Sequence, residues 1–202
     1  MGTIFNLRVL LCLVALLGHR RTDRDLLGNS TSNHPIINYQ ASNDQIPSRQ
    51  NAETTQRLLE IAKSQIGVRE ASGNNDGKQV EAYLKYTGNR KGEPWCAAFV
   101  SWVFGQTGLK EPRTAWSPSL FPKSKLSAYA NPAVIFGVYY TEKRRIAHVG
   151  IVEKQKGSWV YAIEGNTNLA GSREGDGVYR KLRHIRTIHS YANWLPEEGG
   201  VK

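Results

Sequence analysis

The chain has 202 residues, which is enough for one globular domain with appendages and too few for two ordinary domains. Its composition is 40% hydrophobic and 22% charged, as in a soluble fold, and its formal net charge of +10 favours attraction to nucleic acid, anionic lipid or acidic wall polymers. No zinc-finger spacing, heptad repeat or phosphate-binding glycine loop accompanies that charge, so we expect no nucleic-acid partner.

The first 21 residues predict the compartment. Arg8 precedes the apolar run from Val9 to Leu17, and polar sequence begins at His19. A short apolar stretch after a positive start is typical of a secretory signal, because it is too short to span a bilayer comfortably. No small-x-small cleavage site precedes His19, so an uncleaved membrane anchor is the alternative. We therefore expect an exported protein, periplasmic or secreted, that meets a membrane only through residues 1–21 if they are retained.

Residues 22–51 are rich in Asn, Ser, Gln and Asp and show no sustained apolar period. This composition predicts a disordered polar tether between the export signal and a folded domain over residues 52–195. The densest basic run, at residues 180–186, is interpreted as a solvated strand or loop face, with a binding patch as the alternative.

Three helices are expected before any strand. Apolar residues recur at helical spacing at Leu58, Leu59, Ala62 and Ile66. They predict an amphipathic helix over residues 53–66, and turn-forming residues follow at 72–77. A second apolar group at 80–84 predicts a short helix that ends at Gly88.

The third helix is expected to begin at Pro94, because proline fits the first helical position, where its missing N–H costs nothing. Residues 95–104 are almost entirely apolar, and Gly105 or Gly108 would end the helix. With so little polarity on any face, this helix should be the buried centre of the domain.

After the third helix the apolar period changes from helical to alternating. The segments expected to be strands are 133–140, 146–154, 158–164 and 178–183. Helices followed by a run of strands predict an α+β fold, in which helices pack on one side of an antiparallel sheet.

Cysteine usage singles out Cys96. The other cysteine, Cys12, lies in the apolar run of the signal, so the mature chain would hold one thiol. A single thiol cannot form an internal disulfide and is a chemical liability outside the cell. A buried cysteine that acts as a small hydrophobe is the structural alternative. In the first turn of a helix, however, unpaired N–H groups and the helix dipole stabilise a thiolate and can also meet an oxyanion.

A cysteine nucleophile needs a base, and the base needs a partner that orients it. His148 is the best candidate for the base, because it lies within the otherwise apolar segment 146–152. A lone strand histidine is more often structural, but this one shares the chain with a solitary thiol. His184 and His189 are rivals in a basic, irregular region.

Glu164 and Asn166 are the candidates for the orienting partner. Strand parity places Val160, Ala162 and Glu164 on one face, and Asn166 would continue that face if the strand stays extended. One of the two polar groups would hold the imidazole tautomer, and the other would add an acceptor or an oxyanion donor. A solvent-facing strand end and a plain turn are the structural alternatives.

Three sequence blocks resemble the signature blocks of the cysteine, histidine-dependent amidohydrolase/peptidase (CHAP) domain. They are Pro94-Trp95-Cys96-Ala97-Ala98-Phe99-Val100-Ser101-Trp102, Ala147-His148-Val149-Gly150-Ile151-Val152 and Ile163-Glu164-Gly165-Asn166. The resemblance spans residues 57–183. It implies a papain-like α+β fold with residues 52–195 as the catalytic domain. One departure is that Pro132 is followed by Ala133-Val134, where such domains often carry Gly-Asp.

The resemblance also implies a cysteine hydrolase that cuts amide bonds of bacterial peptidoglycan through a thioester, as an amidase or endopeptidase. By motif position, Cys96 resembles the nucleophile and His148 the base. Glu164 resembles the residue that orients the base, and Asn166 a supporting polar group. The expected partner is peptidoglycan and the expected state is a monomer, and neither a cofactor nor a metal is expected. The alternatives are a catalytically silent module that binds wall peptides or a partner, and an amidase of a small soluble peptide-like conjugate.

Two further features are interpreted as structural, without a role in binding. Asn74, Asn75 and Asp76 could supply oxygen ligands to calcium, but a turn is expected because hard-cation sites usually need more carboxylates. Trp116 lies in a proline-flanked loop, where a tryptophan usually caps the nearby core, so a contact with a substrate groove is the less favoured interpretation. Trp159 is expected in the core.

Overall fold

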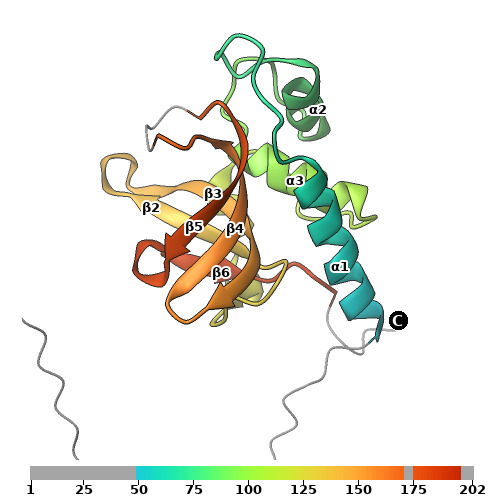
Figure 1. Ribbon diagram of the computed structural model, residues 1–202, viewed down its shortest axis with the longest axis vertical. Coiled ribbons are helices and arrows are strands. Elements are labelled where there is room, and N and C mark those ends of the chain that lie inside the picture. The colour runs from blue at the N-terminus through green and yellow to red at the C-terminus, as the bar shows by residue number, and fades with distance from the viewer. Residues whose placement is uncertain (1–48, 171–174, 197–202) are drawn as a thin grey trace, which may run out of the picture. The chain divides into compact units, whose positions relative to one another are not determined.

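The computed structural model describes residues 49–170 and 175–196 (Figure 1). The predicted export signal, residues 1–21, lies outside the described residues, and so does most of the predicted tether, residues 22–48. Among the described residues, no helix combines the length and the apolar character that crossing a bilayer requires.

The first two helices follow the expected pattern with small shifts at their ends. Helix α1 spans Arg49–Ser64 and buries Leu58 and Ala62, and α2 spans Lys78–Tyr86. Helix α1 begins at Arg49, inside the predicted tether, and in its polar first turn Arg49 Nε lies 3.0 Å from Glu53 Oε1. Such (i, i+4) pairs support a helix whose exposed turn carries no apolar signal.

Helix α3 spans Cys96–Gln106, and eight of its eleven residues are buried. This confirms the expected buried central helix. The expected start at Pro94 is wrong, because Trp95 precedes the helix in a non-helical conformation (φ −126°, ψ 11°) and serves as its N-cap. Cys96 is therefore the first residue of the helix.

All four expected strands form, and they belong to a six-stranded sheet among the described residues. The strands are β1 (Leu126–Ser127), β2 (Ile135–Tyr140), β3 (Arg145–Lys156), β4 (Trp159–Thr167), β5 (Gly177–His184) and β6 (Ser190–Ala192). Their order is β1-β6-β2-β3-β4-β5, and the neighbours pair antiparallel. Short 3-10 helices occur at η1 (Ser117–Leu120), η2 (Lys123–Lys125), η3 (Thr141–Lys143) and η4 (Ile185–Thr187).

The helices lie together on one side of the sheet (Figure 1). Helix α3 packs on β3 and β4, and both α1 and α2 pack on α3. A large apolar cluster fills the space between these helices and the sheet. A smaller, separate cluster is formed by other strand residues, among them Phe136, Val152 and Val160. The α+β class, with N-terminal helices packed on an antiparallel sheet, is thereby confirmed.

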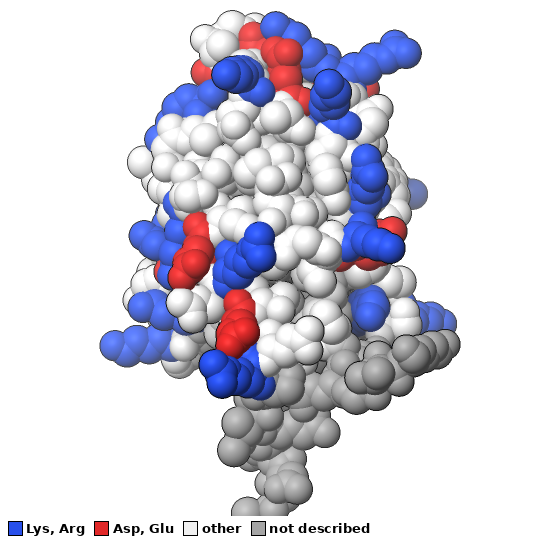
Figure 2. Space-filling model, turned by 90° about the vertical axis from the view of Figure 1, so that its right-hand side faces the viewer, with Lys and Arg blue, Asp and Glu red and all other residues white. Residues whose placement is uncertain are grey.

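Figure 2 shows the face that includes α1. On this face Lys and Arg side chains are spread among Asp and Glu side chains and surround an uncharged centre. The positive charge on this side of the molecule is therefore dispersed, and it does not form one concentrated patch.

Candidate active site

Cys96 occupies the first position of α3 and is 6% exposed. The N-cap residue, Trp95, makes no capping hydrogen bond with its side chain, and its carbonyl accepts from Phe99 N at 2.8 Å. The N–H groups ahead of Phe99 have no intrahelical acceptor and lie at the positive end of the helix dipole. The start of α3 is thus suited to hold a thiolate or an oxyanion.

Trp95 fixes the position of this helix start. Its ring is fully buried and stacks against Tyr83 with ring centroids 5.6 Å apart. Its Nε1 donates to Glu70 Oε1 at 2.8 Å, and Glu70 Oε2 accepts from Asn75 N at 3.0 Å. The turn that precedes α2 therefore braces the residue next to Cys96.

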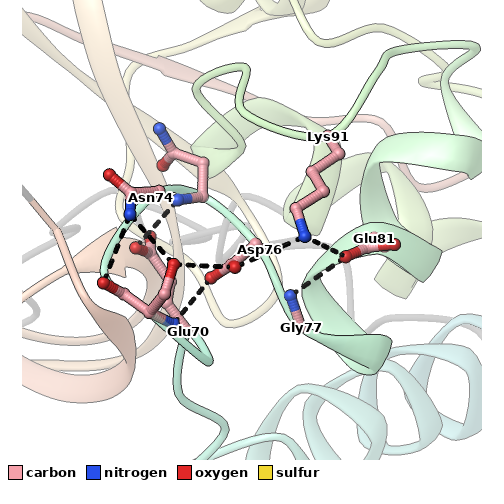
Figure 3. Close-up of polar contacts among 8 residues, drawn as sticks. Glu70, Asn74, Asp76, Gly77, Glu81 and Lys91 are labelled. Carbon is pink, nitrogen blue, oxygen red and sulfur yellow. Dashed lines mark hydrogen bonds and ion pairs between the residues drawn. The ribbon is translucent and has the colours of Figure 1, made fainter.

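The turn around Asp76 is closed by hydrogen bonds and one lysine (Figure 3). Asp76 Oδ1 accepts from Ser72 N, and Oδ2 accepts from Ser72 Oγ, both at 2.8 Å. Lys91 Nζ lies 3.5 Å from Asp76 Oδ2 and 3.5 Å from Glu81 Oε1, between the two carboxylates. The hydrogen bonds from Ser72 and the charge of Lys91 lower the pKa of Asp76. These contacts form the expected turn. Among the described residues, no group of three or more His, Cys, Asp or Glu side chains could hold a metal ion, and the expected absence of calcium stays a prediction.

A β-bulge positions His148, which is 7% exposed. Val138 pairs with His148, but the next residue of β2, Tyr139, pairs with Ile146, so Ala147 is an extra residue in β3. A bulge of this kind redirects the side chains beside it. His148 Nε2 lies 2.7 Å from Glu164 Oε2, which leaves the other ring nitrogen for the thiol of Cys96.

Glu164 is fully buried on β4. The expected strand parity is confirmed, because Val160 and Ala162 lie in one apolar cluster at alternate positions before it. Arg183 Nε donates to Glu164 Oε1 at 2.7 Å, and Arg183 Nη2 donates to Oε2 at 2.6 Å. A buried carboxylate requires such compensation, because the loss of hydration would otherwise favour its neutral form.

Arg183 is a residue of the candidate site that the sequence interpretation missed. The basic run 180–186 is not a uniformly solvated face: the side chain of Arg180 is 48% exposed and pairs with Glu153, whereas that of Arg183 is 22% exposed. Arg183 pairs in register with Val160, and residues paired across strands share a face. Because Val160, Ala162 and Glu164 share a face of β4, Arg183 lies on the same face as Glu164. The sequence could indicate this contact only if β4 and β5 were known to be neighbours.

Two glycines allow these side chains to approach. A Cβ on Gly150 would lie 2.7 Å from Glu164 Cγ, so glycine lets the carboxylate lie across β3. A Cβ on Gly165 would lie 2.7 Å from both Phe99 Cγ and Trp95 Cζ3, so glycine lets β4 approach the first turn of α3. Both glycines belong to the motif blocks that carry the resemblance described above.

Electrostatics favour a charged pair of nucleophile and base. Burial raises the pKa of Cys96, but the hydrogen bond and charge of His148, with smaller effects of Ser117 and the Val149 N–H, lower it below its usual value. Burial lowers the pKa of His148, but Cys96 and Glu164 together raise it to about 9. Burial raises the pKa of Glu164, but Arg183 and His148 lower it to about 2. The lowered pKa of Cys96 and the raised pKa of His148 both favour a thiolate beside an imidazolium, which is the state of an activated cysteine nucleophile.

Asn166 does not continue the regular strand. Between the pairs Glu164–Tyr179 and Thr167–Gly177, β4 advances by three residues but β5 by only two. Asn166 lies in this irregular stretch and has φ +51°. Its Nδ2 donates to Asn75 Oδ1 at 3.3 Å. The strand does not stay regularly extended through Asn166, so the condition for Asn166 to continue the Glu164 face is not met. The supporting role of Asn166 stays a prediction.

The two rival histidines make other contacts. His184 Nδ1 accepts from Arg186 N at 3.2 Å, and its ring meets Trp159 edge-on. His189 lies against Tyr139 with ring centroids 5.1 Å apart. Trp159 is 46% exposed at the end of β4, so its expected place in the core is wrong.

A cleft of about 420 Å³ lies beside Cys96. Its walls include the loop before α3, residues 113–117 and the segment from Lys143 to Ala147. Ser117 was not predicted; it is 4% exposed, and its Oγ lies 3.6 Å from Cys96 Sγ. Trp116 lines the cleft and is 53% exposed, so the interpretation of Trp116 as a cap on the core is wrong.

Comparisons with solved structures give distant matches. The peptidoglycan hydrolase RipB from Mycobacterium tuberculosis is 15% identical, with a TM-score of 0.46, over 75% of this chain and 70% of that chain. RipA, a resuscitation promoting factor interacting protein, is 14% identical, with a TM-score of 0.45, over 76% of this chain and 67% of that chain.

A Staphylococcus aureus protein of the NLP/P60 family, described as similar to a lipoprotein, is 14% identical, with a TM-score of 0.43, over 72% of this chain. The match covers 42% of that protein, so this chain spans less than half of its length. No protein-family model and no curated protein matches this chain. Family membership therefore stays a resemblance.

Proposed function

We propose that this protein is an exported cysteine hydrolase that cleaves amide bonds of bacterial peptidoglycan. The observation that carries the proposal is the buried thiol of Cys96, whose pKa His148 lowers, together with the hydrogen bonds that join His148 and Arg183 to Glu164. A buried thiol beside a histidine with a raised pKa, itself hydrogen-bonded to an ionised carboxylate, meets the requirements for covalent catalysis by a nucleophile, a base and an orienting group.

In the first half of the proposed reaction, the Cys96 thiolate attacks the carbonyl carbon of the amide. The oxygen takes the negative charge and is stabilised by N–H groups in the first turn of α3. His148, as imidazolium, gives its proton to the nitrogen of the leaving amine. The C–N bond then breaks, and the acyl group remains on Cys96 as a thioester.

In the second half, neutral His148 takes a proton from water, and the resulting hydroxide attacks the thioester carbon. The C–S bond breaks, the carboxylic acid product leaves, and the thiolate and the imidazolium are restored. Glu164 keeps the imidazole oriented and stabilises its charge in both halves. Each proton moves between His148, the amine and water.

Peptidoglycan is proposed as the substrate because the three motif blocks resemble those of CHAP domains and because residues 1–21 predict export. Residues 52–195 would form the catalytic domain. The amide cut would lie either between the sugar and the stem peptide or within the peptides.

Digestion of purified peptidoglycan tests this proposal, with mass spectrometry of the released fragments. The expected result is new amino and carboxyl termini with the wild-type protein and none with Cys96→Ala, whose unfolding midpoint should stay close to that of the wild type. Fragments released equally by Cys96→Ala would refute the proposal. Binding to peptidoglycan without cleavage would favour the silent binding module, and cleavage of short soluble peptides alone would favour the conjugate amidase.

A further inference from the structure

Arg145 and Trp116 form a stacked pair at the edge of the cleft. The Arg145 guanidinium carbon lies 4.2 Å from the centroid of the Trp116 ring. Trp116 directly precedes Ser117, the neighbour of Cys96, and Arg145 lies three residues before His148 in β3. The pair is therefore connected to the base through the backbone of β3 and to the nucleophile through the side chain of Ser117.

Arg145 differs from the other strand arginines in its partners. Arg180 and Arg183 each make two hydrogen bonds to a carboxylate. Within the described ranges the hydrogen bond of Arg145 goes from Nη1 to the backbone carbonyl of Ile146 at 3.1 Å, and no ion pair there includes Arg145. A guanidinium has five N–H donors, so most of those of Arg145 are available to a ligand.

Besides Arg145, the charged residues that line the cleft are two basic residues and one acidic residue. Lys143 is exposed on the same wall. Arg113 is already engaged, because its Nε donates to Tyr86 O at 2.8 Å and its guanidinium lies over the Tyr86 ring. The carboxylate that lines the cleft, Glu93, accepts hydrogen bonds from Asn89 and from Arg90 N.

We propose that Arg145, held over the ring of Trp116, is a subsite for a carboxylate of the substrate next to the scissile amide. A guanidinium held over an indole ring by cation–π attraction can still present N–H groups to a ligand, and these can bind a carboxylate through two parallel hydrogen bonds. Lys143 contributes a second positive charge on the same wall. This inference rests on the proposed function of Cys96 and narrows its substrates to peptide amides that carry a free carboxylate within reach of Arg145.

A pair of alkylating reagents tests the subsite without any hydrolysis. N-iodoacetylglycine carries a carboxylate, and N-iodoacetylglycinamide is its neutral counterpart of nearly the same shape. The measurement is the ratio of the two rate constants for alkylation of Cys96. The wild-type protein should favour the acid, and Arg145→Gln should lower the ratio about tenfold, since a charge-assisted hydrogen-bonded pair contributes on that scale. The preference should also weaken in high salt, because salt screens exposed charges.

Arg113→Gln is the matched control, because it removes a cation of the same cleft that is engaged with Tyr86; the ratio should stay near the wild-type value. The rate with the neutral reagent shows whether each variant keeps an intact site. An unchanged ratio in Arg145→Gln, with the neutral rate preserved, would overturn the subsite. A neutral rate no higher than that of free cysteine would instead count against Cys96 as an activated nucleophile, which separates the two failures.

Discussion

Arg183 donates two hydrogen bonds to Glu164, and the oxygen that accepts from Arg183 Nη2 at 2.6 Å also lies 2.7 Å from His148 Nε2. Glu164 is fully buried and would tend to become neutral without compensation. Arg183 and His148 instead hold its pKa at about 2. The ionised carboxylate in turn helps to raise the pKa of His148 to about 9. Arg183 thus acts on the thiol through two intermediate residues, as a positioning residue.

Replacing Arg183 by Gln should therefore destabilise the fold and change the titration of the site. Removing one partner of a buried ion pair leaves the other charge uncompensated, which costs about 3 kcal/mol in the free energy of unfolding. Because Glu164 would then take up a proton at a higher pH, the lower pH limit of hydrolysis should shift upward. Urea unfolding and the pH profile of kcat check the two effects.

Arg180→Gln provides the control for this prediction. Arg180 lies on the same strand and also pairs with a carboxylate, but its side chain is 48% exposed. Exposed pairs contribute up to about 1 kcal/mol, so this variant should keep its stability within that range and its pH profile unchanged. If Arg180→Gln and Arg183→Gln shift the profile equally, Arg183 has no particular role in the site.

Acid should destabilise the wild-type protein more than Glu164→Gln. The pKa of Glu164 is about 2 in the folded chain, against an ordinary value of 4.5, so its stabilising contribution is present above pH 4.5 and is lost as the pH falls through 2. The shift corresponds to about 3 kcal/mol. The free energy of unfolding, measured between pH 5 and pH 2, should fall less steeply in Glu164→Gln. Parallel curves for the two proteins would show that Glu164 has no depressed pKa.

Gly150→Ala should impair the site by displacing Glu164. The added methyl group would lie 2.7 Å from Glu164 Cγ and from Phe136 Cε1, and overpacking of this kind costs about 1–3 kcal/mol. The pH at which Cys96 reacts at half its maximal rate should therefore rise. In Gly157→Ala, where no atom lies within 4 Å and φ is +56°, the backbone strain should cost about 1 kcal/mol and leave the thiol unchanged. Equal effects of the two substitutions on thiol reactivity would contradict this role of Gly150.

Much of this architecture could be predicted from local sequence patterns. Helical apolar spacing located α1 and α2, and the apolar run after Trp95 located α3. Alternation located the four longer strands. The strands β1 and β6 contain two and three residues, too few for any alternation to be visible. The start of α3 was misplaced because the contacts that keep Trp95 out of the helix, with Glu70 and Tyr83, are distant in sequence.

The site residues could be predicted where residue type and strand alternation within one segment were sufficient. Cys96, His148 and Glu164 stand together in the structure as their residue types suggested. Arg183 was missed because its partner depends on the neighbouring strand, and Ser117 because a loop brings it to the thiol. Parity failed at Asn166, since an irregularity in strand pairing cannot be read from alternation.

The rate of Cys96 alkylation by iodoacetamide as a function of pH tests the central claim most directly, because the thiolate alone reacts. The half-maximal rate should occur at a lower pH than for a free cysteine, whose pKa is about 8.5. In His148→Ala the midpoint should move to that value or above, since burial then acts without the histidine. A wild-type midpoint at or above about 8.5 that His148→Ala leaves unchanged would contradict an activated thiol at this site.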